Sequence, residues 1–129
     1  MLVDSCGGVL REEYLDFEEL VDADNQLVGL SVGPYHLDWH DQTCLRFRFS
    51  VDENFVSLEY NFHFQTREGR LIWRKDKQPG HEGAVGLTHI HLNPDDPEQR
   101  DPFSEVDFDE VLEEVHAYHE SGWMPEPSN

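Results

Sequence analysis

The side chains best suited to chemistry are concentrated between residues 46 and 91. His89 and His91 lie two positions apart on a predicted strand, so their side chains point to the same face, and His63 lies on an earlier strand. Histidine can move a proton near neutral pH, and arginine presents paired donors to phosphate oxygens. These residue types predict acid–base chemistry on a substrate that carries phosphate groups.

Strict alternation of apolar and polar residues predicts that these side chains share one face of a sheet. If the apolar faces of the central strands pack against helices, the opposite face collects Arg46, Arg48, Asn61, His63, Gln65, Arg70, Arg74, His89 and His91. RNA fits such a face because its 2′-hydroxyl is a built-in nucleophile. Cleavage then needs only a base, an acid and cationic stabilisation of the phosphorane, with no metal and no cofactor.

Two other interpretations of the histidines stay open. His63, His81, His89 and His91 could together bind zinc or nickel. Alternatively, His89 and His91 simply line a solvated strand. There is no GxxxxGK loop, and no GxGxxG follows a strand, so nucleoside-triphosphate hydrolysis and dehydrogenase chemistry are not expected.

The charge of the chain is extreme and uneven. The 129 residues carry 28 acids and 9 bases, a formal net charge of −19, yet residues 46–77 hold seven of the bases against five acids. The acidic remainder indicates either a halophilic protein, with a surface adapted to high salt, or a basic partner. The central segment is the part of the chain whose charge suits an RNA substrate.

The elements that must position these residues follow from hydrophobic periodicity. Leu10, Tyr14, Phe17 and Val21 form a stripe that predicts an N-terminal helix. Period-two alternation predicts strands over Gln26–Val32, Tyr35–His40, Thr43–Ser50, Phe55–Thr66, Arg70–Lys75 and Leu87–Leu92.

A second helix is predicted near the end of the chain. It begins at Asp107, where Glu110 completes a capping box, and it ends at Gly122. The expected fold class is α+β, an antiparallel sheet of about five to six strands with an N-terminal and a C-terminal helix packed on one face. We expect residues 1–124 to form one domain and residues 125–129 a disordered tail. Neither a signal peptide nor a long apolar segment is present, which predicts a cytoplasmic location.

The motifs of the central segment resemble the TumE-like family of small toxins from toxin–antitoxin loci. The similarity rests on the aromatic-His-aromatic-Gln run at 62–65, the Gly-Arg-Leu-Ile-Trp-Arg-Lys-Asp run at 69–76, Pro79-Gly-His81 and His89-x-His91. It implies a toxin that cleaves RNA and that a helix-turn-helix antitoxin, encoded nearby, neutralises. A homodimer is left open.

The resemblance also implies roles for particular residues. His63 or His89 would be the general base or acid, Arg74 would hold phosphate and Asp76 would orient a histidine. His81 and His91 complete the catalytic set. The expected substrate-binding residues are Arg46, Arg48, Gln65 and Arg70.

Three departures from the family pattern keep other functions open. Lys77 stands where relatives tend to have Asn, Gly80 replaces the first of two histidines, and residues 86–88 lack the usual histidines. If the lost histidines are catalytic, the chain would be a non-catalytic acidic interaction protein. A histidine-rich metal-binding protein is the other alternative.

Overall fold

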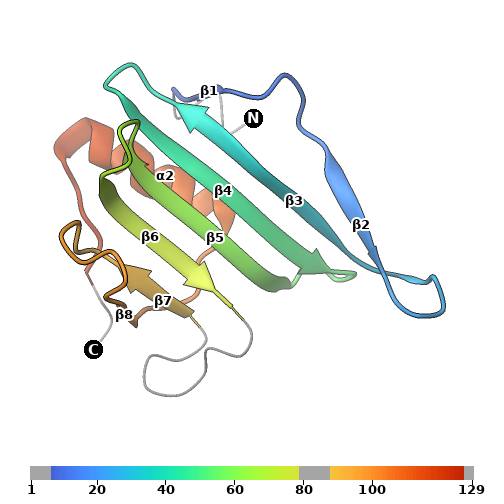
Figure 1. The fold of residues 1–129 in the computed structure, drawn as a ribbon. Helices are drawn as coiled ribbons and strands as arrows, with labels where there is room; N and C mark the ends of the chain where they lie inside the picture. The colour runs from blue at the N-terminus through green and yellow to red at the C-terminus, as the bar shows by residue number, and fades with distance from the viewer. Residues whose placement is uncertain (1–6, 79–87, 127–129) are drawn as a thin grey trace.

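A single antiparallel sheet dominates the computed structural model, which describes residues 7–78 and 88–126. Eight strands are assigned within these residues, in the order β1-β3-β4-β5-β6-β7-β8, and β2 pairs with β3 beside β1 (Figure 1). The strands are β1 (Val9–Leu10), β2 (Phe17–Val21), β3 (Leu27–Asp38), β4 (Thr43–Asp52), β5 (Ser57–Thr66), β6 (Leu71–Lys77), β7 (Thr88–His91) and β8 (Asp101–Pro102). Every pairing is antiparallel, as the short connections between the central strands predict.

The central strands form where period-two alternation is cleanest. Phe62 and Phe64 of β5 lie opposite Phe47 and Leu45 of β4, and these four side chains are 1% exposed or less. Residues between them point to the other face, because successive side chains of a strand alternate. This alternation is what separates an apolar face from a polar one.

One helix covers the apolar face. In α2 (Phe108–Ser121), Val111, Leu112 and Val115 are buried against the sheet. Asp107 caps its first turn by accepting a hydrogen bond from the backbone N–H of Glu110 at 2.8 Å, as predicted. Among the described residues, no helix is long and apolar enough to cross a membrane.

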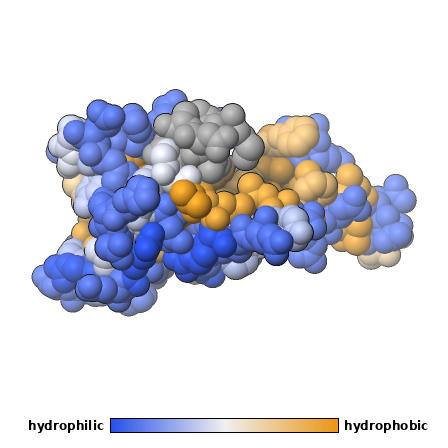
Figure 2. Space-filling view, turned by 90° about the horizontal axis from the view of Figure 1, so that it is seen from above, coloured by the Kyte–Doolittle hydropathy of each residue, from blue (hydrophilic) through white to orange (hydrophobic). Residues whose placement is uncertain are grey.

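The helix stops short of one end of the sheet. In Figure 1, α2 lies behind the left part of the sheet, and β2 with the adjoining part of β3 extends to the right beyond it. Figure 2 shows a band of hydrophobic residues that runs toward this end between hydrophilic ones. The apolar face therefore has a covered part and an open part.

The predicted N-terminal helix is wrong. β1 and β2 occupy this segment, both paired with β3. The apolar residues of this segment have helical spacing, but they do not pack as one stripe against the core. Tyr14, Phe17 and Val21 are 74%, 57% and 51% exposed, so burial gives a helix here no stabilisation. Backbone hydrogen bonding with β3 outweighs the weak local preference of this segment for a helix.

The two separate strands predicted over Gln26–Val32 and Tyr35–His40 are wrong, since one strand, β3, continues through Gly33-Pro34 with a cis peptide bond and an irregular register. Gly33 has a φ of 94°, and a Cβ there would lie 2.5 Å from the carbonyl oxygen of Phe47. Only glycine permits this close approach. The short strand β8 falls in a stretch for which periodicity predicts no strand.

Candidate functional site

The polar face of the sheet is built as two transverse rows. Cα pairing aligns, across β4 to β7, the row Arg46, His63, Arg74 and His91. The next row contains Arg48, Asn61, Asp76 and His89. Directly paired residues on one face have Cβ atoms only about 5 Å apart, so each row is a line of touching side chains.

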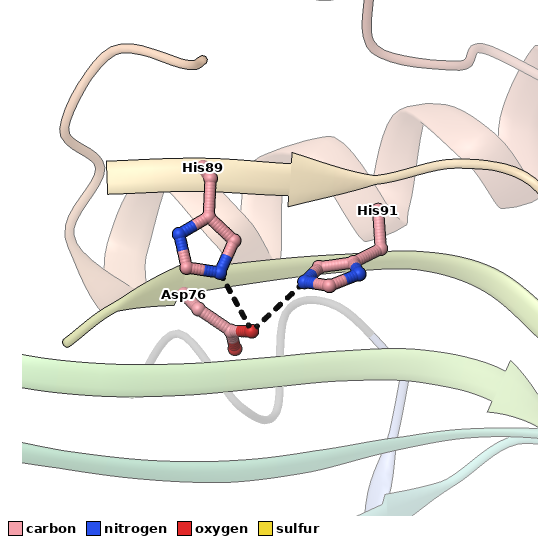
Figure 3. Close-up of side chains that lie close together, drawn as sticks. All are labelled: Asp76, His89 and His91. Carbon is pink, nitrogen blue, oxygen red and sulfur yellow. Dashed lines mark ion pairs between the residues drawn. The ribbon is translucent and has the colours of Figure 1, made fainter. Parts of the chain in front are cut away.

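Asp76 lies at the centre of a buried polar cluster. His89 and His91 both point toward it from β7, and each places Nε2 near the same carboxylate oxygen, Oδ2, at 3.4 and 3.3 Å respectively (Figure 3). All three residues are 1% exposed. Burial of this kind costs free energy unless the charge is compensated, so the neighbours of Asp76 must stabilise its carboxylate.

Two further side chains provide that compensation. Arg74 donates from Nε to Asp76 Oδ2 at 2.9 Å, and Asn61 donates a short hydrogen bond from Nδ2 to Oδ1. Burial acts to raise the pKa of the Asp76 carboxyl, but the hydrogen bond with His91 and the charges of Arg74 and the histidines outweigh it and lower that pKa. Asp76 is therefore a carboxylate at neutral pH.

Both ring nitrogens of His91 have polar neighbours. Nδ1 lies 2.7 Å from the carbonyl oxygen of Pro97, which can only accept, so Nδ1 donates this hydrogen bond. Nε2 lies 3.0 Å from Arg74 Nη2 and 3.3 Å from Asp76 Oδ2. The guanidinium of Arg74 thus bridges His91 and Asp76, and this fork fixes its orientation on the sheet face.

His63 is the half-buried histidine of the row. Burial, followed by the charge of Arg74, lowers its pKa to about 4, and Arg46 acts in the same direction. The ring is consequently neutral at pH 7 and can accept a proton. Arg46, on the other side of His63, is exposed and pairs with no carboxylate among the residues that the structure describes.

The other residues predicted for the site lie apart from the row of Arg46, His63 and Arg74, or outside the residues that the structure describes. Arg48 pairs with Glu59 at 2.8 Å, and Arg70, in the turn before β6, lies 3.8 Å from Asp95. Gln65 follows a register irregularity near the end of β5. His81 lies outside the described residues.

One subset of the cluster has the composition of a metal site. Asp76, His89 and His91 offer one carboxylate oxygen and two imidazole nitrogens within 4.8 Å of one another. The contact of His91 Nδ1 with a backbone carbonyl resembles the outer contacts of metal-binding histidines. The guanidinium of Arg74, however, already bonds to both Asp76 Oδ2 and His91 Nε2.

Three contributors to the site were not predicted from the sequence. Asn61 was assigned to the polar face but given no role, and Pro97 lies in the connection between β7 and β8. His36 of β3 extends the first row, since it pairs with Arg46, and its Nδ1 lies 2.5 Å from Glu12 Oε1. The register of β5 and β6 shifts between Phe64 and Gln65, so counting back from the turn at Gly69 does not match Asn61 with Asp76.

Comparison with known protein families identifies the family to which this chain belongs. The family model described as Toxin TumE matches residues 4–119. The chain therefore belongs to the TumE toxin family, and it is the toxin component of a toxin–antitoxin system with an antitoxin as its partner. No curated protein and no solved structure matches the chain significantly.

Proposed function

We propose that this toxin is a metal-independent RNA endonuclease that works through the polar sheet face. The observation that carries the proposal is the row Arg46, His63 and Arg74, in which a neutral histidine lies between two arginines on neighbouring strands. Strands are spaced about 4.8 Å apart, so the three side chains span about 10 Å, the size of one phosphodiester with its sugars.

The role of His63 follows from its protonation state. A neutral ring can take the proton of a 2′-hydroxyl, which then attacks the adjacent phosphorus. The bond from phosphorus to the 5′ oxygen breaks, the leaving oxygen takes a proton from water, and a 2′,3′-cyclic phosphate remains. A pKa of about 4 makes His63 a weak base that stays available well below pH 7.

The arginines stabilise the charge that develops on phosphorus. Arg46 is exposed and has no carboxylate partner among the described residues, so phosphate does not have to displace an ion pair. Arg74 is 24% exposed, and its bonds to Asp76 and His91 hold the guanidinium in place before substrate arrives. Donors fixed in advance stabilise a transition state with no cost of reorganisation.

The buried histidines then have a positioning role. His89 and His91 are 1% exposed, so they reach no substrate bound on the surface. Both contact Asp76, and His91 also contacts Arg74, so their role would be to hold the guanidinium in place for the substrate. This differs from the role of general acid or base that family resemblance implies for His89.

Cleavage of a short RNA tests the proposal. We expect the purified protein to cut it in the presence of EDTA, leaving a cyclic phosphate, and His63→Ala to lower the rate by about 10²–10⁴-fold, the usual contribution of a general base. A strand with 2′-deoxyribose at the cut site should be inert.

His116→Ala is the matched control, because this histidine lies on the exposed side of α2 with a half-exposed side chain. Its rate should equal that of the wild type. Equal rates for His63→Ala and the wild type would remove His63 from the mechanism. No cleavage by the wild type, together with intact growth inhibition, would favour a non-catalytic toxin.

The second candidate function is metal binding at Asp76, His89 and His91, favoured by the closeness of their ligand atoms. It requires Arg74 to move away, so Arg74→Ala should strengthen binding. Titration with Co²⁺, followed by its visible absorption, distinguishes the two functions. Micromolar binding that His89→Ala abolishes, with cleavage lost in EDTA, would replace the metal-independent mechanism.

A further inference from the structure

The apolar face of the sheet continues beyond the beginning of α2. Phe108, the first residue of the helix, packs its ring 4.6 Å from that of Phe47 and 5.4 Å from that of Phe49. Phe17 lies on the same face as Phe49, because both pair with Val32, yet it is 57% exposed. The sheet thus presents apolar side chains that no element among the described residues covers.

A cavity lies at the border between the covered and open parts. It has a volume of about 320 Å³ and is lined mainly by Phe49, Val51, Phe55, Tyr60, Phe62 and Phe108. Phe55 lies in the turn between β4 and β5, is 78% exposed and has a φ of 62°. A bulky residue gains nothing there from burial and is disfavoured by the backbone, so folding alone does not account for it.

The charged residues that border this apolar surface include three acids. Asp107 and Asp109 line the cavity, and exposed Glu19 falls in the transverse row that continues through Leu30 and Val51. No lysine or arginine occurs between residues 12 and 45, the segment that supplies β2 and β3. A partner must therefore offer apolar side chains flanked by positive charge.

We propose that this open apolar face, consisting of Phe17, Leu30, Val51 and Phe55 with the cavity beside them, is where the antitoxin docks. The occupant is a basic amphipathic segment whose apolar side chains enter the cavity and whose lysines or arginines meet Asp107, Asp109 and Glu19. The surface and His63 lie on opposite faces of the sheet. The segment is thus an anchor, and neutralisation depends on the rest of the antitoxin that it holds.

Charge distinguishes this occupant from the others. A second copy of the chain would bring an equally acidic rim against this one, and each chain carries a net charge of −19. An anionic membrane would be repelled for the same reason. Membership of a toxin family implies an antitoxin as the partner. The acidic rim favours a positively charged segment of that partner.

Affinity for the purified antitoxin encoded beside the toxin gene tests the proposal by calorimetry. We expect Phe55→Asp to weaken binding by about a hundredfold, the effect of losing an anchoring aromatic residue, and Asp109→Lys to weaken it by about tenfold. Phe55→Asp should fold normally, since the side chain is exposed and aspartate tolerates a positive φ better than phenylalanine. Raising NaCl from 0.1 to 1 M should weaken wild-type binding.

Tyr14→Asp is the matched control, an aromatic residue that is 74% exposed outside this surface, and its affinity should stay within about twofold of the wild type. An affinity of Phe55→Asp within that same range would place the antitoxin elsewhere. Light scattering that shows a wild-type dimer and a monomeric Phe55→Asp variant would assign the surface to a second copy. Calorimetry and light scattering do not depend on RNA cleavage. The docking proposal can therefore be wrong while the proposed nuclease function is correct.

Discussion

Two regions of one sheet face differ mainly in what lies on top of them. Under α2, Phe47, Phe62 and Phe64 are 1% exposed or less and pack around the helix. Toward β2 and the turn after β4, Phe17 and Phe55 are 57% and 78% exposed. The alternation that builds both regions is the same, so alternation specifies an apolar face and not whether that face is filled from within the chain.

The opposite, polar face of the sheet also has a buried part and an accessible part. Over β5 to β7 it buries a carboxylate and two histidines, and next to them it leaves His63 and Arg46 accessible. Polar side chains on a sheet thus divide into those that fix geometry and those that can meet a ligand. Exposure, and not residue type, separates the two groups.

The largest predicted difference is in stability between two phenylalanines of the two regions. Phe62→Ala empties a fully buried position and should lower the free energy of unfolding by about 3–5 kcal/mol. Phe55→Ala removes an exposed ring and should change it by less than about 0.5 kcal/mol. Urea denaturation of both variants measures the contrast. Similar losses would mean that Phe55 is part of the core.

A smaller loss is expected at the buried polar cluster. Asp76→Asn keeps the shape of the side chain but removes the charge that Arg74 and the histidines compensate, which should cost about 1–3 kcal/mol at pH 7. Because the folded-state pKa of Asp76 is lowered, its stabilising contribution is complete above the unfolded pKa and is lost as pH falls through the folded one.

Denaturation at pH 7 and at successive values below pH 4 measures this dependence. The gap between wild type and Asp76→Asn should narrow with acidification. A gap that widens in acid would mean that the folded-state pKa is raised instead.

The smallest predicted difference is in the KM for RNA, between variants of two arginines in neighbouring rows of the polar face. Arg46→Gln should raise the KM for RNA by about tenfold, since its unpaired guanidinium is available to phosphate. Arg48→Gln should change it by less than about twofold, because Arg48 is paired with Glu59 in an exposed contact. Steady-state cleavage of the same RNA compares them, and reversed effects would shift the substrate toward the second row.

The sequence predicts the central part of this fold well. Strands β4 to β7 and helix α2 follow from clean periodicity and, for α2, from the cap at Asp107 and the stop at Gly122. The N-terminal helix failed because its apparent stripe is formed by residues that pair with β3 or stay exposed. Strand β8 is two residues long and depends on pairing with β7, which leaves no periodic signal.

The candidate site was predictable as a face but not as an arrangement. Alternation placed Arg46, His63 and Arg74 together, since it requires only that each strand keep its phase. The fork of Arg74 joins β6 to His91 of β7, and the contact of His91 with Pro97 involves the loop after β7. No local pattern encodes such tertiary contacts.

The most direct measurement is growth inhibition with and without co-expressed antitoxin, compared between His63→Ala and Phe55→Asp. We expect His63→Ala to be harmless yet still to capture the antitoxin, because the open apolar face is unchanged. Phe55→Asp should arrest growth and escape neutralisation, because the polar face is unchanged. Toxicity retained by His63→Ala, or neutralisation retained by Phe55→Asp, would contradict the division of labour between the two faces.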